Sequence, residues 1–285
     1  AVFAGGWSLE LAEQICSDDK LEALDILDML GHLVDKSLVA VDEDKTGTRY
    51  RILETVRQYA REKLFETDEI TVIRNRHRDV YLALAESAEP ELMRGQQKQW
   101  LNMLETELDN LRSAFNWSLE NKDGEEALRF CSGLANFWGM HRHEEEGLLF
   151  SKQALALTNE NNNLNTTFWY AATLLSYVAV RSTIEWKSYS DPTLMPLLEQ
   201  AHHIFESINN YTTSAPVVTY SSLAGAHMNL NDLTTAESYL SDLDEKVNAS
   251  GYQLGIAWTR QVMAGLALTK GDTDSWIRLL EEALE

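Results

Sequence analysis

Histidines and carboxylates gather at two places in this sequence, at spacings that bear on metal binding. His141 and His143 precede three glutamates at 144–146, and a His-x-His pair followed by carboxylates offers nitrogen and oxygen ligands to a divalent ion. The alternative is a short turn that leads into the first turn of a helix, and we favour it. His202 and His203 are neighbours on a predicted helix, so they point to different faces and make poor co-ligands.

Other signatures of catalysis are missing from the sequence. No serine stands in a nucleophile-elbow setting, and no Gly-x-x-x-x-Gly-Lys-Ser/Thr phosphate loop occurs. The two cysteines, Cys16 and Cys131, lie far apart in amphipathic segments, which fits buried free thiols in a reducing cytosol. We therefore expect no enzyme, no metal and no cofactor within this chain, and a cytoplasmic location.

The chain carries a formal net charge of −21. Binding to nucleic acid or to an anionic membrane requires clustered Lys and Arg, so the acidity argues against both. No apolar run approaches the roughly 20 residues that cross a bilayer. One basic cluster stands out, formed by Arg74, Arg76, His77 and Arg78. It could grip an acidic partner or a phosphate, but we favour a solvated helix face.

The first 66 residues predict a small domain of helices and one hairpin. Ser8 is a suitable N-cap for a helix from Leu9 to Cys16, and apolar residues at spacings of three and four mark a second helix through about Asp35. Residues 37–41 and 49–52 have the composition of two strands joined by a turn. The apolar face of the second helix consists of Leu21, Leu24, Leu27, Leu30 and Val34. Helix, helix, hairpin, helix is the order of a winged-helix domain.

A winged helix often binds DNA, but its two contact elements are acidic here. The candidate recognition helix sets four carboxylates against Lys20 and Lys36, and the hairpin tip sets three against Lys45. These carboxylates are Glu22, Asp25, Asp28 and Asp35 in the helix, and Asp42, Glu43 and Asp44 at the tip. Both surfaces would repel phosphate, so we favour a winged helix that contacts protein over direct DNA binding.

Several blocks of this sequence resemble bacterial STAND-class signalling ATPases of the NB-ARC type, large regulators also described as LuxR-type. They are residues 3–8 (FAGGWS), 30–39 (LGHLVDKSLV), 50–60 (YRILETVRQYA), 76–77 (RH), 105–114 (ETELDNLRSA), 137–138 (FW) and 146–147 (EG). The resemblance covers residues 1 to about 157. It implies an ATPase module, then a winged helix, then a repeat array, in which a signal at the array releases a closed, ADP-bound form. ADP or ATP would bind in a module upstream of this chain.

The resemblance also singles out the junction between the second strand and the next helix. Ile52-Leu53-Glu54 occupies the place of a Met-His-Asp triplet in related eukaryotic ATPases, whose His contacts the ADP phosphate. Leu53 replaces that His, so the resemblance does not extend to phosphate contact. Glu54 can cap the helix, because a helix N-terminus favours an anion. Leu53, Glu54 and Arg57 are the implied relay to the ATPase module, and a capped helix without a signalling role is the alternative, which we favour.

Residues 67–122 predict a helical linker. Asp68–Ala88 suggests one or two amphipathic helices, Pro90 breaks the helix, and Gln97–Leu119 is a second long helical stretch. The apolar stripe of the long helix consists of Trp100, Leu101, Leu104, Leu108, Leu111, Phe115 and Leu119. A stripe of this kind indicates a core face.

Residues 123–285 predict stacked helical hairpins of the tetratricopeptide (TPR) type. The pattern Leu223-Ala224, His227, Ala236, Leu240 and Leu243 recurs forty residues later as Met263-Ala264, Ala267, Trp276, Leu280 and Ala283. Small residues let two antiparallel helices approach closely, and each hairpin must bury its face on a neighbour. Trp276 stands where the pattern has a small residue, so we expect looser packing there.

Projection of the repeat pattern places nine side chains on the concave face of the array. They are Arg129, Ser132, Asn136, Trp169, Thr173, Ser221, Met228, Trp258 and Gln261. Aromatic residues and an arginine on such a face suit a protein or peptide ligand. The same side chains could equally be stacking contacts between hairpins.

The expected fold is mostly α, with three parts: a winged-helix domain with one β-hairpin at 1–66, a helical linker at 67–122 and an α-α superhelix of TPR-like hairpins at 123–285. The chain begins at Ala1 without Met and ends within a helical pattern, so we expect a segment of a larger regulator. The leading hypothesis is that the segment holds an ATPase closed until a partner binds the array. A constitutive TPR scaffold is the alternative, and DNA binding is a third hypothesis.

Overall fold

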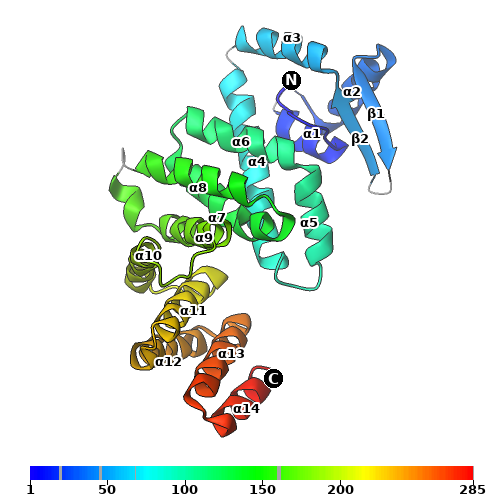
Figure 1. The fold of residues 1–285 in the computed structure, drawn as a ribbon. Helices are drawn as coiled ribbons and strands as arrows, with labels where there is room; N and C mark the ends of the chain where they lie inside the picture. Colours follow the sequence, from blue (N-terminus) through cyan, green and yellow to red (C-terminus); the bar gives the residue numbers. More distant parts are fainter. Residues whose placement is uncertain (19–20, 45–46, 68, 159–161, 285) are drawn as a thin grey trace. The chain divides into compact units, whose positions relative to one another are not determined.

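The computed structural model describes residues 1–18, 21–44, 47–67, 69–158 and 162–284. Within these ranges the chain is mostly helical and has one two-stranded sheet (Figure 1). It divides into two compact units, Ala1–Phe137 and Trp138–Glu285. The predicted class, mostly α with a single β-hairpin near the N-terminus, is confirmed. No helix among the described residues is both long and apolar enough to cross a membrane.

The first unit opens with α1 (Leu9–Cys16), α2 (Ala23–Asp35), β1 (Val39–Asp44), β2 (Gly47–Ile52) and α3 (Glu54–Phe65). The Ser8 hydroxyl accepts a hydrogen bond from the Leu11 N–H at 3.3 Å, which confirms the predicted cap of α1. The two strands pair antiparallel, with Val39 opposite Ile52. Trp7 adds a bridge on the other side of β2, because its backbone exchanges hydrogen bonds of 3.0 and 2.8 Å with Tyr50.

The predicted buried face of α2 is wrong in part. Leu30 is buried, but Leu24 is 76% exposed and Leu27 is 44% exposed, whereas Ile26 is the second buried side chain. Apolar residues surround much of this helix, and α1 and β1 cover only the side that carries Ile26 and Leu30. The helix is therefore rotated relative to the prediction, and a row of leucines faces solvent.

The rest of the first unit consists of α4 (Ile70–Glu91), α5 (Gln97–Thr106), α6 (Leu108–Glu120) and the beginning of α7 (Gly124–His141). The segment predicted as one or two helices is the single helix α4, which ends one residue after Pro90. The helical stretch predicted over 97–119 is confirmed as helix, but it is divided into α5 and α6 by a break at Glu107. At this residue the backbone has φ −97° and ψ 6°, outside helical values, and its buried carboxylate takes up the partners described below.

The second unit contains α8 (Glu144–Leu157), the 3-10 helix η2 (Asn162–Thr166), α9 (Phe168–Glu185), α10 (Met195–Ile208), α11 (Ser214–Asn229), α12 (Leu233–Ser250), α13 (Gln253–Lys270) and α14 (Thr273–Glu282). From α8 onward each α-helix contacts the next one, and α11 also contacts α9 and α13 (Figure 1). The chain therefore forms successive hairpins whose first helices lie side by side.

Small and apolar residues occupy the predicted packing positions of these hairpins. Five of them, Leu223, Ala224, Ala236, Leu240 and Leu243, are almost fully buried. Gly147 permits a close approach, because a Cβ atom built there would lie 2.8 Å from the Trp138 ring. The predicted turns at Asn231 and Gly271 both have positive φ, 60° and 77°. Packing loosens at the last hairpin as expected, since α14 has no buried side chain and Trp276 is half-buried.

Candidate functional site

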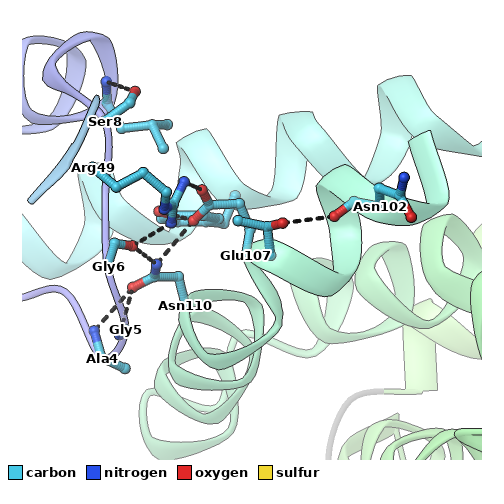
Figure 2. A network of polar contacts seen from close by, with 11 residues as sticks. Ala4, Gly5, Gly6, Ser8, Arg49, Asn102, Glu107 and Asn110 are labelled. Carbon is cyan, nitrogen blue, oxygen red and sulfur yellow. Dashed lines mark hydrogen bonds and ion pairs between the residues drawn. The ribbon is translucent and has the colours of Figure 1, made fainter. Parts of the chain in front are cut away.

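A buried carboxylate, Glu107, is the centre of a polar joint in the first unit. Its side chain is 5% exposed and accepts hydrogen bonds from three side chains. Arg49 Nη1 of β2 donates to Oε1 at 2.6 Å, and Tyr81 Oη of α4 and Asn110 Nδ2 of α6 each donate to Oε2 at 2.9 Å. One carboxylate thus joins the winged-helix hairpin to two helices of the linker (Figure 2).

Asn110 and Arg49 also hold the segment before α1, residues 3–7, which we term the strap. Asn110 Oδ1 accepts from the Ala4 N–H at 2.9 Å, and Asn110 Nδ2 donates to the Gly6 carbonyl at 2.9 Å. Arg49 Nη2 donates to the same carbonyl at 2.8 Å (Figure 2). Gly5 allows this approach, because a Cβ atom there would lie 3.3 Å from Asp109 Cβ.

Aromatic rings pack the strap onto β2 and α4. Phe3 stacks on Trp7 with ring centroids 4.7 Å apart, and its edge meets His77 at 5.7 Å. His77 lies 4.6 Å from the ring of Tyr81, whose hydroxyl belongs to the joint. The polar joint is therefore bordered by an apolar layer, and that layer limits the access of water to its hydrogen bonds.

Burial changes the acidity of two groups in this layer. Desolvation lowers the pKa of His77 to about 4, although a hydrogen bond with Asn110 opposes the shift, so the imidazole is neutral at pH 7. Burial, with the negative charge of Glu107 beside it, raises the pKa of the Tyr81 hydroxyl well above its ordinary value. Tyr81 therefore remains a hydrogen-bond donor to Glu107 throughout the physiological range.

The three residues predicted as the relay lie at the start of α3. Leu53 is the N-cap residue and is 52% exposed. Glu54 places a carboxylate in the first turn of the helix, as predicted, but it is the first helical residue and makes no side-chain cap. Its carboxylate accepts from Arg57 Nε and Nη2 at 2.9 and 2.8 Å. This pair lowers the pKa of Glu54. Arg57 Nη1 also donates to the Ala4 carbonyl at 3.1 Å, so it links α3 to the strap.

The residues predicted for the concave face fall into two groups. Arg129, Ser132 and Asn136 lie in the part of α7 that belongs to the first unit. Arg129 forms two hydrogen bonds with Glu86 of α4, at 2.7 and 3.0 Å, so its guanidinium is held by the linker. This ion pair raises the pKa of Arg129 further.

The other predicted groove residues lie on α9, α11 and α13, the neighbouring first helices of successive hairpins. Trp258 is 40% exposed and Gln261 is exposed, while Trp169, Ser221 and Met228 are half-buried. Thr173 is fully buried, which corrects the prediction that it faces a ligand. Thr173 lies where α9 packs against other helices of the array. Its small side chain is buried in that contact and is not accessible to a ligand.

The two histidine clusters of the second unit each lie close to a glutamate. His143 is the N-cap residue of α8 and lies 3.9 Å from Glu146 in the first turn, as the helix-start interpretation predicts. His202 and His203 lie closer together than predicted, since both approach Glu206, at 3.5 and 3.7 Å. However, the Lys246 ammonium lies 3.4 Å from the same carboxylate and already offsets its charge.

The sequence interpretation did not identify the joint. Glu107 and Asn110 lie within one block that carries the family resemblance, and Arg49 immediately precedes another, but nothing assigned them to one network. One signal was available: Glu107 and Asn110 are polar residues that directly precede Leu108 and Leu111 of the apolar stripe. Polar residues on a core face must find buried partners.

Comparisons with known proteins identify the two parts of the chain. The family model described as a winged helix-turn-helix domain matches residues 1–65. An HTH-type transcriptional regulator of Mycobacterium tuberculosis (strain ATCC 25618 / H37Rv) is 45% identical over 148 residues, 52% of this chain and 17% of the relative. An uncharacterized protein of the same strain is 40% identical over 79 residues, 27% of this chain and 20% of that relative. The chain thus spans no more than a fifth of these relatives.

A solved structure supports the identification of the repeats. Crystallised TPR-like repeats from Podosopora anserina, described as a kinesin light chain, align with a TM-score of 0.50 over 73% of this chain and 94% of that chain. The sequence identity is 14%, so the likeness concerns the fold alone. The chain combines a winged-helix domain, related in sequence to transcriptional regulators, with TPR-like helical hairpins.

Proposed function

We propose that this chain is the regulatory segment of a STAND-type signalling ATPase that acts in transcriptional control. In this proposal the winged helix restrains an ATPase module, and the TPR-like array binds a protein or peptide signal. The observation that carries the proposal is the joint at Glu107, which ties the strand before the relay residues to the helices of the linker. The similarity to a much longer HTH-type regulator supports it.

The proposed mechanism is a coupling free energy between array and ATPase, which requires two states with different contacts. The restrained state would contain the Arg49–Glu107 ion pair, and signal binding would favour a state in which the strap and β2 separate from α6. Leu53, exposed at the start of α3, would contact the ATPase module, while Glu54 and Arg57 orient that end of the helix.

Nucleotide belongs, in this proposal, to a module outside the chain. No Gly-x-x-x-x-Gly-Lys-Ser/Thr sequence is present, so we assign ADP and ATP to the upstream module and no catalytic step to these residues. The protein would work in the cytoplasm, where nucleotide and transcription targets are available.

The test uses a protein that joins the ATPase module to this chain. Release of labelled ADP is measured for the whole protein, for a truncation without the repeats and for Glu107→Gln. We expect faster release from both variants, because each weakens the restraint. Asp42→Asn, at an exposed pair with Arg51, is the matched control and should release ADP at the wild-type rate. Equal ADP retention in all four proteins would refute the proposal.

A constitutive TPR scaffold is the second candidate, favoured by the exposed Trp258 on α13. A scaffold predicts that replacing Arg129, Trp169 and Trp258 by Ala abolishes partner capture and leaves ADP release unchanged. A regulatory array predicts that the same triple variant loses the response of ADP release to the partner. The response of ADP release to the partner, measured on this triple variant and on the wild type, therefore distinguishes the two functions.

A further inference from the structure

We propose that a four-arginine pocket beside the joint binds a phosphate-bearing ligand. The pocket has a volume of about 440 Å³ and lies among α3, α4, α6 and the strap. Its lining consists of Ala4, Arg57, Arg61, Arg74, Asp109, Arg112, Ser113, Asn116 and Glu120. None of these residues belongs to the relay mechanism except Arg57.

The net positive charge of the pocket lining favours an anionic ligand. Four guanidinium groups face two carboxylates in the lining, so the pocket is net positive in a chain whose formal net charge is −21. Arg61 forms no hydrogen bond or ion pair within the described part of the chain. Its side chain is exposed and lines the pocket. An unpaired guanidinium among three others incurs repulsion, which an oxyanion would relieve.

Neighbouring contacts hold the other three arginines in place. Arg74 donates to Glu120 at 2.9 Å, and its guanidinium carbon lies 3.8 Å from the Trp117 ring centroid. Arg112 donates to Asp109 at 3.1 Å, and Arg57 is held by Glu54 and the Ala4 carbonyl. Arginines fixed in this way lose less side-chain entropy when they bind a ligand.

The chemistry of the lining favours phosphate over other anions. Guanidinium forks match the geometry of phosphate oxygens, and Ser113 and Asn116 can add hydroxyl and amide donors. The volume accommodates more than one phosphate group. The source can be a free oxyanion or a nucleotide, since both present the same phosphate oxygens.

Binding here would act on the joint through Arg57. Its Nη1 donates to the Ala4 carbonyl, and the Ala4 N–H donates to Asn110, which donates to Glu107. A ligand that draws Arg57 toward the pocket therefore competes with a bond of the strap. This consequence rests on the proposed function, whereas the binding itself does not.

The experiment is calorimetric titration of this chain with inorganic pyrophosphate and with ADP at low ionic strength. The variant Arg61→Gln/Arg112→Gln should bind either ligand at least about tenfold more weakly, because each lost charged hydrogen bond contributes on that order. Arg51→Gln, on β2 and outside the lining, removes a charge elsewhere and should bind as wild type. Circular dichroism melts verify that each variant is folded.

The outcomes separate the sources and decide the proposal. Tighter binding of ADP than of pyrophosphate identifies a nucleotide ligand, and equal or weaker binding identifies a free oxyanion. The proposal is overturned if neither ligand binds, if the double variant binds like wild type, or if Arg51→Gln weakens binding equally. Preference for a glutamate-rich peptide over pyrophosphate would also overturn it. None of these results depends on ADP release from an ATPase module, so failure here leaves the proposed function standing.

Discussion

At the scale of single residues, Glu107 determines how the winged helix is attached to the linker. A buried carboxylate is costly unless its partners replace the water that it loses. Glu107 has three such partners from β2, α4 and α6, and one of them is a guanidinium. The attachment is therefore specific in geometry, because a shift of any of these elements leaves a buried polar group without its partner.

Glu107→Ala should lower the free energy of unfolding of the first unit by about 3 kcal/mol, because Arg49 loses its buried partner and Asn110 and Tyr81 lose an acceptor. Hydrogen exchange of α4 and α6, followed by mass spectrometry, measures this unit separately from the repeats. Asp42→Ala removes the exposed partner of Arg51 at 3.6 Å and should change stability by less than about 0.5 kcal/mol. Similar effects of the two substitutions would contradict the importance of burial.

His77 should make the first unit sensitive to mild acid. Its pKa is about 4 in the folded protein, below the ordinary value of 6.5, so between these values the unfolded chain binds a proton that the folded protein excludes. Its contribution to stability is complete above pH 6.5 and decreases as the pH falls toward 4. We expect the unit to be about 1 kcal/mol less stable at pH 5.5 than at pH 7.5 from this group alone.

The measurement is the midpoint of urea unfolding of the first unit at several pH values. His77→Gln should flatten the dependence between pH 7.5 and 5.5, whatever its effect on absolute stability. His32→Gln, on the exposed side of α2, should retain the wild-type dependence. If His77→Gln and the wild type have parallel pH profiles, the imidazole is not the group that titrates.

At the scale of elements, close helix approach determines the hairpins. Gly147 of α8 lies against the Trp138 ring, and a Cβ atom there would be 2.8 Å from the ring carbons. Trp138 is fully buried and its ring cannot move aside easily. Packing against Trp138 therefore requires glycine at position 147, although alanine would favour the helix.

Gly147→Ala should destabilise the second unit by about 1–3 kcal/mol, the range for overpacking a rigid core. Gly265→Ala, in the interior of α13 with open space around it, should stabilise the unit by about 0.5–1 kcal/mol through helix propensity. Thermal or urea unfolding of both variants checks the pair. The same sign for both would show that propensity, and not the Trp138 contact, governs position 147.

In two helical segments, apolar periodicity was not sufficient to predict the structure. The leucine spacing of α2 is a correct helix signal, yet it did not reveal which side would be covered, because Ile26 and Leu27 point to different faces of an apolar helix. The stripe over 97–119 predicted helix correctly on both sides of Glu107 but not the break. The buried side of α2 and the break at Glu107 both depend on contacts with other elements. A local sequence pattern does not predict such contacts.

At the scale of the whole molecule, the acidity of the winged helix argues against contact with DNA. Glu22, Asp25, Asp28 and Asp35 belong to or border α2, and all are exposed. Of the basic residues weighed against the carboxylates of α2 and the hairpin tip, Lys36 is the exposed C-cap residue of α2. Lys20 and Lys45 lie outside the described residues. Facing a phosphate backbone, such a helix would be repelled.

We therefore expect this chain not to bind duplex DNA, even at low ionic strength. Fluorescence anisotropy of a labelled duplex of mixed sequence is the measurement, with added salt as the second variable. An affinity that declines steeply with salt would contradict the expectation and would assign the winged helix to DNA. A variant with Asp25 and Asp28 changed to Asn shows whether the carboxylates cause the exclusion.

The sequence by itself determined the helices, the hairpin, the αL turns at Asn231 and Gly271 and most packing positions of the repeats. These features follow from local rules: apolar periodicity, caps, turn residues and small residues at helix contacts. Tertiary structure alone decided the rotation of α2, the break at Glu107, the burial of Thr173 and the approach of His202 and His203 to Glu206. Each depends on which distant group lies opposite, as Arg49 does for Glu107 across 58 residues of sequence.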